Sequence, residues 1–289
     1  MVFFVGSVVV IMIQVRLIGA EGARLLQEKW DRDCEHRGGL PPTLRRATIL
    51  ERKSTILIEV GKMLEVIAMS VEDCVAIEKG GADRIELVSA LSEGGLTPSI
   101  GMVEQCVEAV SLPIRVMIRP RSNSFCYSSY DLEVMKYDIE AVKEIGAEGV
   151  VLGCLNQDNS IDVKMLEKLL HVSEGLNVTF HRAFDELHDF EAGLFQLMND
   201  PRIKTVLTSG GYGEMKNRSQ ILKKLMQQAD SSIEILVGSG VTVDNIASLK
   251  AMTNANAFHI GRSARENSDI YGKIVIERIR NIKNIIKQS

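Results

Sequence analysis

Residues 63–88 of the chain read MLEVIAMSVEDCVAIEKGGADRIELV, and this stretch decides the fold. A short apolar segment comes first, and Ser70 is typical of the capped start of the amphipathic helix that follows. Gly80-Gly81 is typical of the end of that helix, and a second apolar segment comes next. The same strand–turn–helix unit occurs eight times between residues 63 and 286. Eight such units close into a barrel with every strand-to-helix turn at one rim, so we expect the functional site at that rim.

The eight expected strands are short runs rich in Val, Ile and Leu, as parallel strands buried on both faces require. They are residues 63–68, 83–88, 114–118, 149–153, 177–180, 205–208, 234–237 and 257–260. We therefore predict an α/β fold, a (βα)8 TIM barrel of eight parallel strands spanning residues 63–289. The alternative is an open doubly wound sheet, whose strand order a sequence does not reveal.

Residues 1–62 do not follow the barrel pattern and form an N-terminal extension. The segment 2–13 is nearly all apolar, but about 12 residues fall short of the roughly 20 that span a bilayer. Its first positive charge, Arg16, follows the apolar run, whereas a secretory signal carries that charge before it. Our favoured interpretation is that Met63 is the natural start and the extension is mispredicted. A real disordered or amphipathic extension and a membrane anchor are the two alternatives.

The composition of the chain indicates which partners and which cellular compartment to expect. The chain carries 34 Lys and Arg against 38 Asp and Glu, and no basic stripe stands out, so we expect no nucleic-acid partner. Its five cysteines form no CxxC pair in a chain too large to need disulfides. This pattern is typical of free thiols in a reducing compartment, so we predict a cytoplasmic protein without a membrane partner.

Charged residues alternate with apolar ones along several expected strands, which places them on the face turned away from the helices. The polar residues of this inner face are Glu65, Arg84, Glu86, Arg119 and His181. Buried ions are costly unless they are paired, so we expect a network. In one interpretation the arginines only neutralise the glutamates. In the other, a polar pocket at the rim binds an anionic ligand, with a carboxylate or the histidine as the acid–base group.

The last two turns, VGSGVT at 237–242 and HIGRS at 259–263, are rich in glycine. Loops after the seventh and eighth strands of a barrel often bind phosphate, and glycine lets the backbone approach an anion. Gly238, Gly240, Gly261 and Arg262 are therefore candidate ligand-binding residues, and Ser209 in the sixth turn extends this cradle. The alternative is that these glycines serve only the tight connections.

Five segments of the chain together resemble the CutC family, which is named for copper homeostasis. They are GADRIEL at 81–87, EGGLTPS at 93–99, MIRPR at 117–121, TFHRAFD at 179–185 and LTSG at 207–210. The resemblance implies a cytoplasmic TIM barrel, often a homo-oligomer, with a link to copper(I).

The chain departs from the family pattern where copper would bind. Family members with proposed copper binding carry cysteines in the first two strands, and the matching positions here are Ile67 and Val88, which do not bind metal. Cys126 and Cys154, in the third turn and after the fourth strand, are the alternative copper(I) ligands, since that ion prefers thiolates. We therefore assign no metal site and no cofactor, and keep this pair as the alternative.

Three functional hypotheses follow. In the first, the barrel binds or transforms a small phosphorylated or carboxylated molecule by acid–base chemistry. The candidate catalytic residues are Glu65, Glu86, His181 and Asp185, the last orienting His181 or its ligand, and the candidate anion-binding residues outside the cradle are Arg84, Arg119 and Arg121. In the second hypothesis the protein handles copper without chemistry. In the third, a non-catalytic barrel recruits a partner, with its extension at the membrane.

Overall fold

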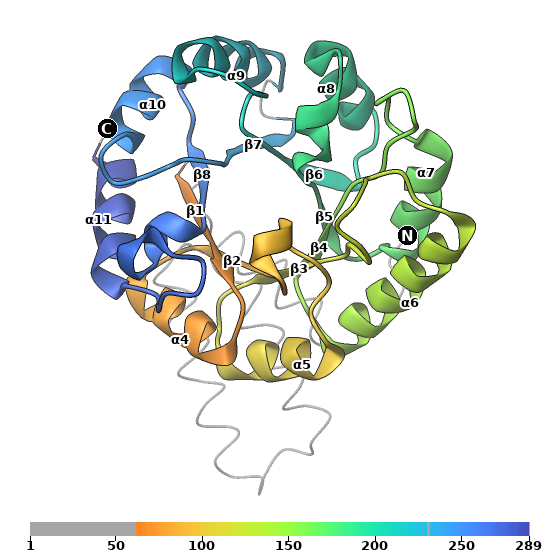
Figure 1. Ribbon diagram of the computed structural model, residues 1–289, viewed down its shortest axis with the longest axis horizontal. Coiled ribbons are helices and arrows are strands. Elements are labelled where there is room, and N and C mark those ends of the chain that lie inside the picture. The colour runs from red at the N-terminus through yellow and green to blue at the C-terminus, as the bar shows by residue number, and fades with distance from the viewer. Residues whose placement is uncertain (1–61, 230–231, 289) are drawn as a thin grey trace, which may run out of the picture. The chain divides into compact units, whose positions relative to one another are not determined.

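The computed structural model describes residues 62–229 and 232–288. Eight parallel strands form a closed barrel in the order β1 to β8, and Figure 1 shows them inside a ring of helices. The strands are β1 (Met63–Ala68), β2 (Arg84–Leu87), β3 (Ile114–Met117), β4 (Gly149–Leu152), β5 (Asn177–Phe180), β6 (Ile203–Thr208), β7 (Glu234–Val237) and β8 (Ala257–Ile260). The predicted (βα)8 barrel is confirmed. Because β8 pairs with β1, the alternative of an open sheet is wrong.

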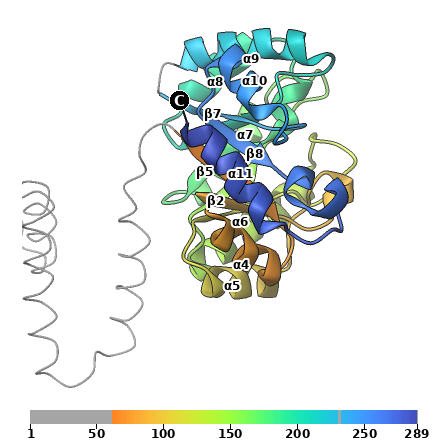
Figure 2. The ribbon, with the colours of Figure 1, turned by 90° about the vertical axis from the view of Figure 1, so that its left-hand side faces the viewer.

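The helices cover the outside of the barrel, as Figure 2 shows from the side. They are α4 (Val71–Gly80), α5 (Ile100–Ala109), α6 (Ser129–Ile145), α7 (Val163–Val172), α8 (Phe190–Met198), α9 (Met215–Ala229), α10 (Ile246–Thr253) and α11 (Ile276–Lys287). In the described part of the chain, four short 3-10 helices lie in the connections: η1 (Leu91–Glu93), η2 (Arg182–Glu186), η3 (Arg262–Ala264) and η4 (Glu266–Ser268). The last helix, α11, packs against both α4 and α10 and so closes the ring.

Local sequence signals set the helix ends. The Ser70 side chain accepts a hydrogen bond from the Asp73 amide at the start of α4, as predicted. Gly81 and Gly146 end α4 and α6 with φ of 82° and 89°, a left-handed conformation that glycine adopts without steric cost. These two junctions lead directly into β2 and β4, so they fix where the next strand begins.

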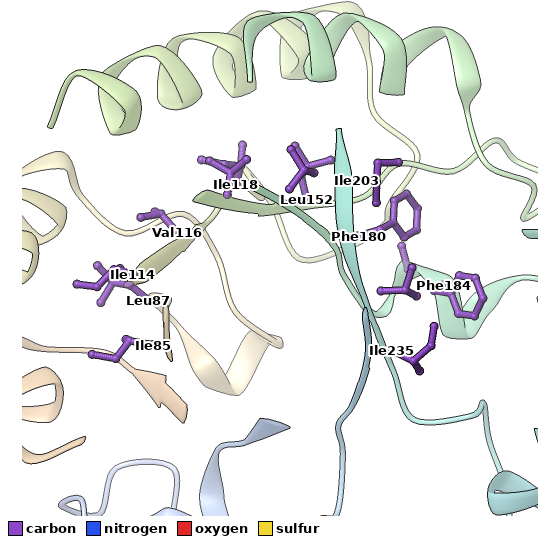
Figure 3. Packing of buried hydrophobic residues seen from close by; sticks show 14 of the residues in the cluster. Ile85, Leu87, Ile114, Val116, Ile118, Leu152, Phe180, Phe184, Ile203 and Ile235 are labelled. Carbon is purple, nitrogen blue, oxygen red and sulfur yellow. The ribbon is translucent and has the colours of Figure 1, made fainter. Parts of the chain in front are cut away.

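The main core lies between the strands and the helices. Figure 3 shows Ile85, Leu87, Val116 and Leu152 among the buried side chains that the strands contribute to it. Each such side chain stabilises the fold by about 1.5–3 kcal/mol when it leaves water. This outer core frees the inner faces of the strands to carry polar side chains.

The barrel interior holds two small apolar groups. One comprises Met63, Leu207, Leu236 and Ala257, and the other comprises Ile67, Val88, Met117 and Val151. Three members of the second group follow Glu65, Glu86 and Arg115 by two positions, which places them one step nearer the C-terminal ends of the strands. These three charged residues therefore lie one step deeper in the barrel than this apolar group.

No helix within residues 62–229 and 232–288 combines the length and the hydropathy that crossing a bilayer requires. The three interpretations of the N-terminal extension concern residues 1–61, which lie outside the described part of the chain.

Candidate functional site

Two buried arginines tie the strands together inside the barrel. Arg84 forms ion pairs with Glu65 and with Glu234, the second at 2.7 Å. Arg115 pairs with Glu148 at 2.9 Å. Neither arginine lines the pocket described below. The contacts of Arg84, a predicted ligand-binding residue, are thus those of a scaffold residue.

Next to these pairs, His259 on β8 lies between two glutamates. Its Nδ1 is 2.8 Å from Oε1 of Glu65, and its Nε2 is 3.6 Å from Oε2 of Glu86. The exposed fractions of the three residues are 6%, 0% and 2% in the order His259, Glu65, Glu86. Oε1 of Glu86 is buried and accepts no hydrogen bond from any described residue. An unsatisfied carboxylate oxygen of this kind is costly, so it is a point where a proton or a ligand gains binding energy.

The three groups differ in protonation. Burial raises the pKa of Glu86 to about 7, although His259 opposes the shift. Burial disfavours a charged His259, but the carboxylates of Glu86 and Glu65 outweigh it and raise the pKa of the imidazole. Burial also acts on Glu65, and there Arg84 and His259 outweigh it and hold the pKa of that carboxyl well below its usual range. Glu65 is therefore a fixed anion, whereas Glu86 exchanges its proton near neutral pH.

A pocket of about 580 Å³ opens at the C-terminal ends of the strands. Glu86 and His259 lie at its strand side, and Ile67, Val88 and Met117 form an apolar part of its wall. Leu207 of β6 and Ile260 of β8 also line it. The connections contribute Leu91, Glu93, Gly94, Arg119, Phe125, His181, Arg182, Glu186, Tyr212, Ser239, Gly240, Val241, Thr242, Gly261, Arg262, Ser263 and Ser268. This pocket lies at the rim where the barrel fold predicts a functional site.

His181, the first residue after β5, lines the same pocket and is 3% exposed. Its Nδ1 accepts a hydrogen bond from the Ala183 amide at 3.1 Å, so the ring proton of the neutral imidazole is on Nε2. Nε2 is buried and has no hydrogen-bond partner among the described residues. Burial, assisted by the positive charge of Arg119, lowers the pKa of His181 to about 3. The imidazole is therefore neutral at physiological pH, with an N–H donor available.

Asp185 does not contact His181, one of the two partners predicted for it. Its carboxylate accepts hydrogen bonds from the Thr208 hydroxyl at 2.6 Å and from the Ser209 hydroxyl at 2.7 Å, and it pairs with Arg182 at 2.9 Å. None of its hydrogen bonds involves His181. Asp185 and Ser209 thus join η2 to the end of β6 and hold Arg182 at the pocket, rather than orienting the imidazole.

The two arginines of the RPR segment also differ from expectation. Arg119 lines the pocket, but its guanidinium donates to the backbone carbonyls of Glu93, Gly95 and Ser122. Arg121 is outside the pocket lining and pairs with Asp131 at 3.0 Å, near the start of α6. Neither guanidinium pairs with Glu65 or Glu86, so the interpretation in which Arg119 neutralises a buried glutamate is wrong.

The glycine-rich cradle is present in part. Gly240, Gly261 and Arg262 line the pocket, whereas Gly238 does not, and its amide donates to Thr208 O. The amides of Ser239, Gly240, Val241 and Gly261 donate to no other described residue. The guanidinium of Arg262 likewise forms no ion pair or hydrogen bond within the described part of the chain. Backbone amides and guanidinium groups are hydrogen-bond donors of the kind that bind anions in proteins.

Two sets of residues could be considered for a metal. Glu65, Glu86 and His259 bring one ligand atom each within 4.8 Å of one another. Both oxygens of Glu65 already contact Arg84 and His259, so fewer protein ligands remain than the three or four of a typical site. Cys126 donates to Asn156 O and is half-buried, while burial raises the pKa of the Cys154 thiol and disfavours the thiolate that binds copper(I).

Sequence reasoning did not place Arg115, Glu234 and His259 on the inner face. The alternation of inward and outward side chains along a strand does identify two of these residues. Arg115 precedes Met117 and Arg119 by two and four positions, and His259 alternates with the outward Phe258 and Ile260. Glu234 is the first residue of β7, so no earlier strand residue shows which face its side chain occupies.

The chain is similar to known proteins along most of its length. Residues 62–264 match the profile of the CutC family. A copper homeostasis protein cutC homolog of Homo sapiens is 43% identical over 209 residues, which cover 72% of this chain and 76% of the relative. A CutC family protein of Bacteroides fragilis is 40% identical over 206 residues, 71% of this chain and 81% of the relative.

A solved structure agrees with these relationships. The crystal structure of a putative copper homeostasis protein CutC from Streptococcus agalactiae has 31% sequence identity and a TM-score of 0.66. The match covers 69% of this chain and 98% of that chain.

Proposed function

The chain belongs to the CutC family, and from the pocket of its barrel we propose that it binds a small anionic molecule and moves a proton on it. One observation carries this proposal: the buried carboxylate of Glu86, a residue that lines the pocket, has an oxygen without a partner among the described residues. A carboxyl group with a pKa near 7 can both accept and donate a proton at physiological pH.

The charges around the pocket support an anionic ligand. Arg182 and Arg262 line the pocket from the fifth and eighth connections. The guanidinium of Arg262 donates no hydrogen bond to any described residue. Four backbone amides of the seventh and eighth connections are available beside it. Barrels commonly bind phosphate at this place. A phosphate or carboxylate group would satisfy donors that the protein leaves unsatisfied.

A titration of the full-length chain with 2-phosphoglycolate tests this proposal. This probe carries a phosphate and a carboxylate, and isothermal calorimetry measures its affinity. Arg262→Ala should weaken binding by roughly 10- to 100-fold, since a hydrogen-bonded charge contributes about 1.5–3 kcal/mol. Arg280→Ala is the matched control, because this exposed arginine of α11 lies outside the pocket lining and contacts only Glu277 and the Lys79 carbonyl among the described residues. Equal affinities of wild type and Arg262→Ala would contradict the cradle.

Copper handling is the second candidate function. The human and streptococcal relatives are named for copper homeostasis, and Cys126 offers a half-buried free thiol next in the chain to Phe125, which lines the pocket. It is less well supported, because Ile67 and Val88 line the pocket with apolar side chains and Cys154 is fully buried. The free thiols and the absence of a long apolar helix in the described residues fit a cytoplasmic location, which we propose with either function.

A further inference from the structure

His181 is a polar residue of the pocket that the proposed proton transfer does not use. Its imidazole is buried, it lines the pocket, and its Nε2–H has no acceptor among the described residues. A buried donor left without an acceptor costs free energy. An oxygen atom of a ligand is the simplest acceptor that would recover this cost.

Several contacts fix the imidazole in this state. The Ala183 amide donates to Nδ1 at the start of η2, which determines the tautomer. The centroid of the ring lies 4.9 Å from that of the Phe125 ring, and Gly153, which follows β4, leaves room for the imidazole by having no Cβ. Arg119, held over Phe125, disfavours a second proton on the ring. His181 is therefore a rigid neutral donor and a poor general base.

Glu86 lines the same pocket from β2 and is the complementary group, a carboxylate able to take a proton. A carboxylate base together with a neutral imidazole donor is an established arrangement for enolising a carbonyl compound. The base removes a proton from the carbon next to the carbonyl, and the imidazole stabilises the negative charge that develops on the oxygen.

We propose that the pocket enolises a small carbonyl compound that carries an anionic group, with Glu86 as the base and the Nε2–H of His181 as the hydrogen-bond donor to the carbonyl oxygen. This inference rests on the proposed function and names its substrate class. The C–H bond next to the carbonyl breaks, its proton moves to Glu86, and its electron pair forms the C=C bond of the enolate. The carbonyl π electrons move to the oxygen, and Glu86 then returns the proton to carbon, so the step needs no other reactant.

The anionic group has a separate place in the pocket. The free amides and Arg262 of the seventh and eighth connections would hold it, while Ile67, Val88 and Met117 offer an apolar wall for the carbon chain. A phosphate ester of a short hydroxyketone has this combination of an anionic end, a carbonyl and an acidic C–H.

Deuterium exchange measures the enolisation step directly. The full-length chain is incubated in D₂O with dihydroxyacetone phosphate or with dihydroxyacetone, and NMR follows the loss of the hydrogens next to the carbonyl. We expect exchange with the phosphate ester at a rate well above that without protein, and little with dihydroxyacetone. Glu86→Gln should abolish it, and this variant, purified in the same way, also controls for isomerases of the expression host.

Two variants of His181 separate a donor from a packing residue. His181→Leu removes the donor and should lower the exchange rate by roughly 10²–10³-fold. His181→Gln retains an N–H donor and should keep more of the rate, while both variants bind the phosphate ester within a few-fold of wild type. His188→Gln, an exposed histidine after the same 3-10 helix, is the control and should exchange like wild type.

The outcomes distinguish this inference from the proposed function. Calorimetric binding of the phosphate ester without exchange would overturn enolisation and leave the anion site standing. Absence of both binding and exchange would overturn both. Exchange that is unchanged in His181→Leu would overturn the role of the imidazole.

Discussion

Gly153 and His181 lie so close that a single Cβ atom on Gly153 would come within 2.6 Å of Nδ1 and 2.7 Å of Cε1 of the imidazole. Gly153 follows β4, and His181 follows the neighbouring strand β5. The glycine is therefore required by the packing of the histidine ring and not by a left-handed backbone conformation. This contact links the strand register of the barrel to the position of a pocket donor.

Gly153→Ala should displace the His181 ring. We expect a loss of about 1–3 kcal/mol in the free energy of unfolding, because the added methyl overfills a packed interior. Chemical denaturation measures this loss, and the NMR signal of the His181 imidazole should shift. Gly101→Ala in α5 is the control: a Cβ there meets nothing within 4 Å, and alanine is the better helix former. Equal stability of Gly153→Ala and wild type would contradict the crowding.

Glu86 should make stability depend on pH. Its pKa is raised to about 7 in the folded protein, so its contribution is present below the ordinary pKa of 4.5 and is lost as pH rises through 7. We expect the free energy of unfolding to fall by roughly 3 kcal/mol between pH 5 and 8 from this group. Its neighbour His259, whose pKa is also raised, acts in the same direction.

Glu86→Gln tests that origin of the pH dependence. The amide does not ionise, and its neutrality also removes the charge that raises the pKa of His259. Denaturation curves of the variant should therefore show a flatter pH profile, with a gain in stability over wild type above pH 7. Parallel profiles for the two proteins would show that other groups cause the dependence.

Glu65→Gln should destabilise the barrel by about 3 kcal/mol at neutral pH, because it leaves part of the buried Arg84 charge uncompensated. Since the pKa of Glu65 is held below its usual range, the difference from wild type should narrow as pH falls below the ordinary value of a glutamate. Glu167→Gln provides the comparison, since this exposed residue pairs with Arg202 on the surface and should cost less than about 1 kcal/mol.

Copper(I) should bind no more tightly than free thiols bind it. The reason is that Cys154 is buried with a raised pKa, and the thiol of Cys126 donates to a backbone carbonyl. An anaerobic competition titration against a chelator of known affinity measures this. Tight one-to-one binding that disappears in the Cys126→Ser/Cys154→Ser double variant would instead support the copper function.

Much of the fold could be predicted because its signals are local. The apolar runs place β1, β5, β7 and β8 with the bounds that the structure has, and the glycine junctions place the strands that follow. β6 begins earlier than predicted, at Ile203, because the exposed Lys204 interrupts the apolar pattern while the backbone continues the ladder.

The candidate site was harder to predict, since hydrogen bonds between distant residues decide it. Alternation identifies Glu86 and His181 as inward residues. It does not show that the guanidinium of Arg119 donates hydrogen bonds to three backbone carbonyl groups. Nor does it show that the Asp185 carboxylate meets Thr208 and Ser209 rather than His181. Such partners depend on the shear of the barrel, and one sequence carries no signal for it.

The packing of α11 against α4 bears on how the chain folds during synthesis. Lys283 of α11 forms an ion pair with Asp83 beside β2, and Ile279 packs where a Cβ on Gly80 would lie. A ribosome makes the first strand before the last, so β1 keeps one unpaired edge until β8 has emerged. The N-terminal half of the barrel therefore stays open during synthesis. The face of α4 that packs against α11 remains exposed until the final helix has been made and the barrel closes.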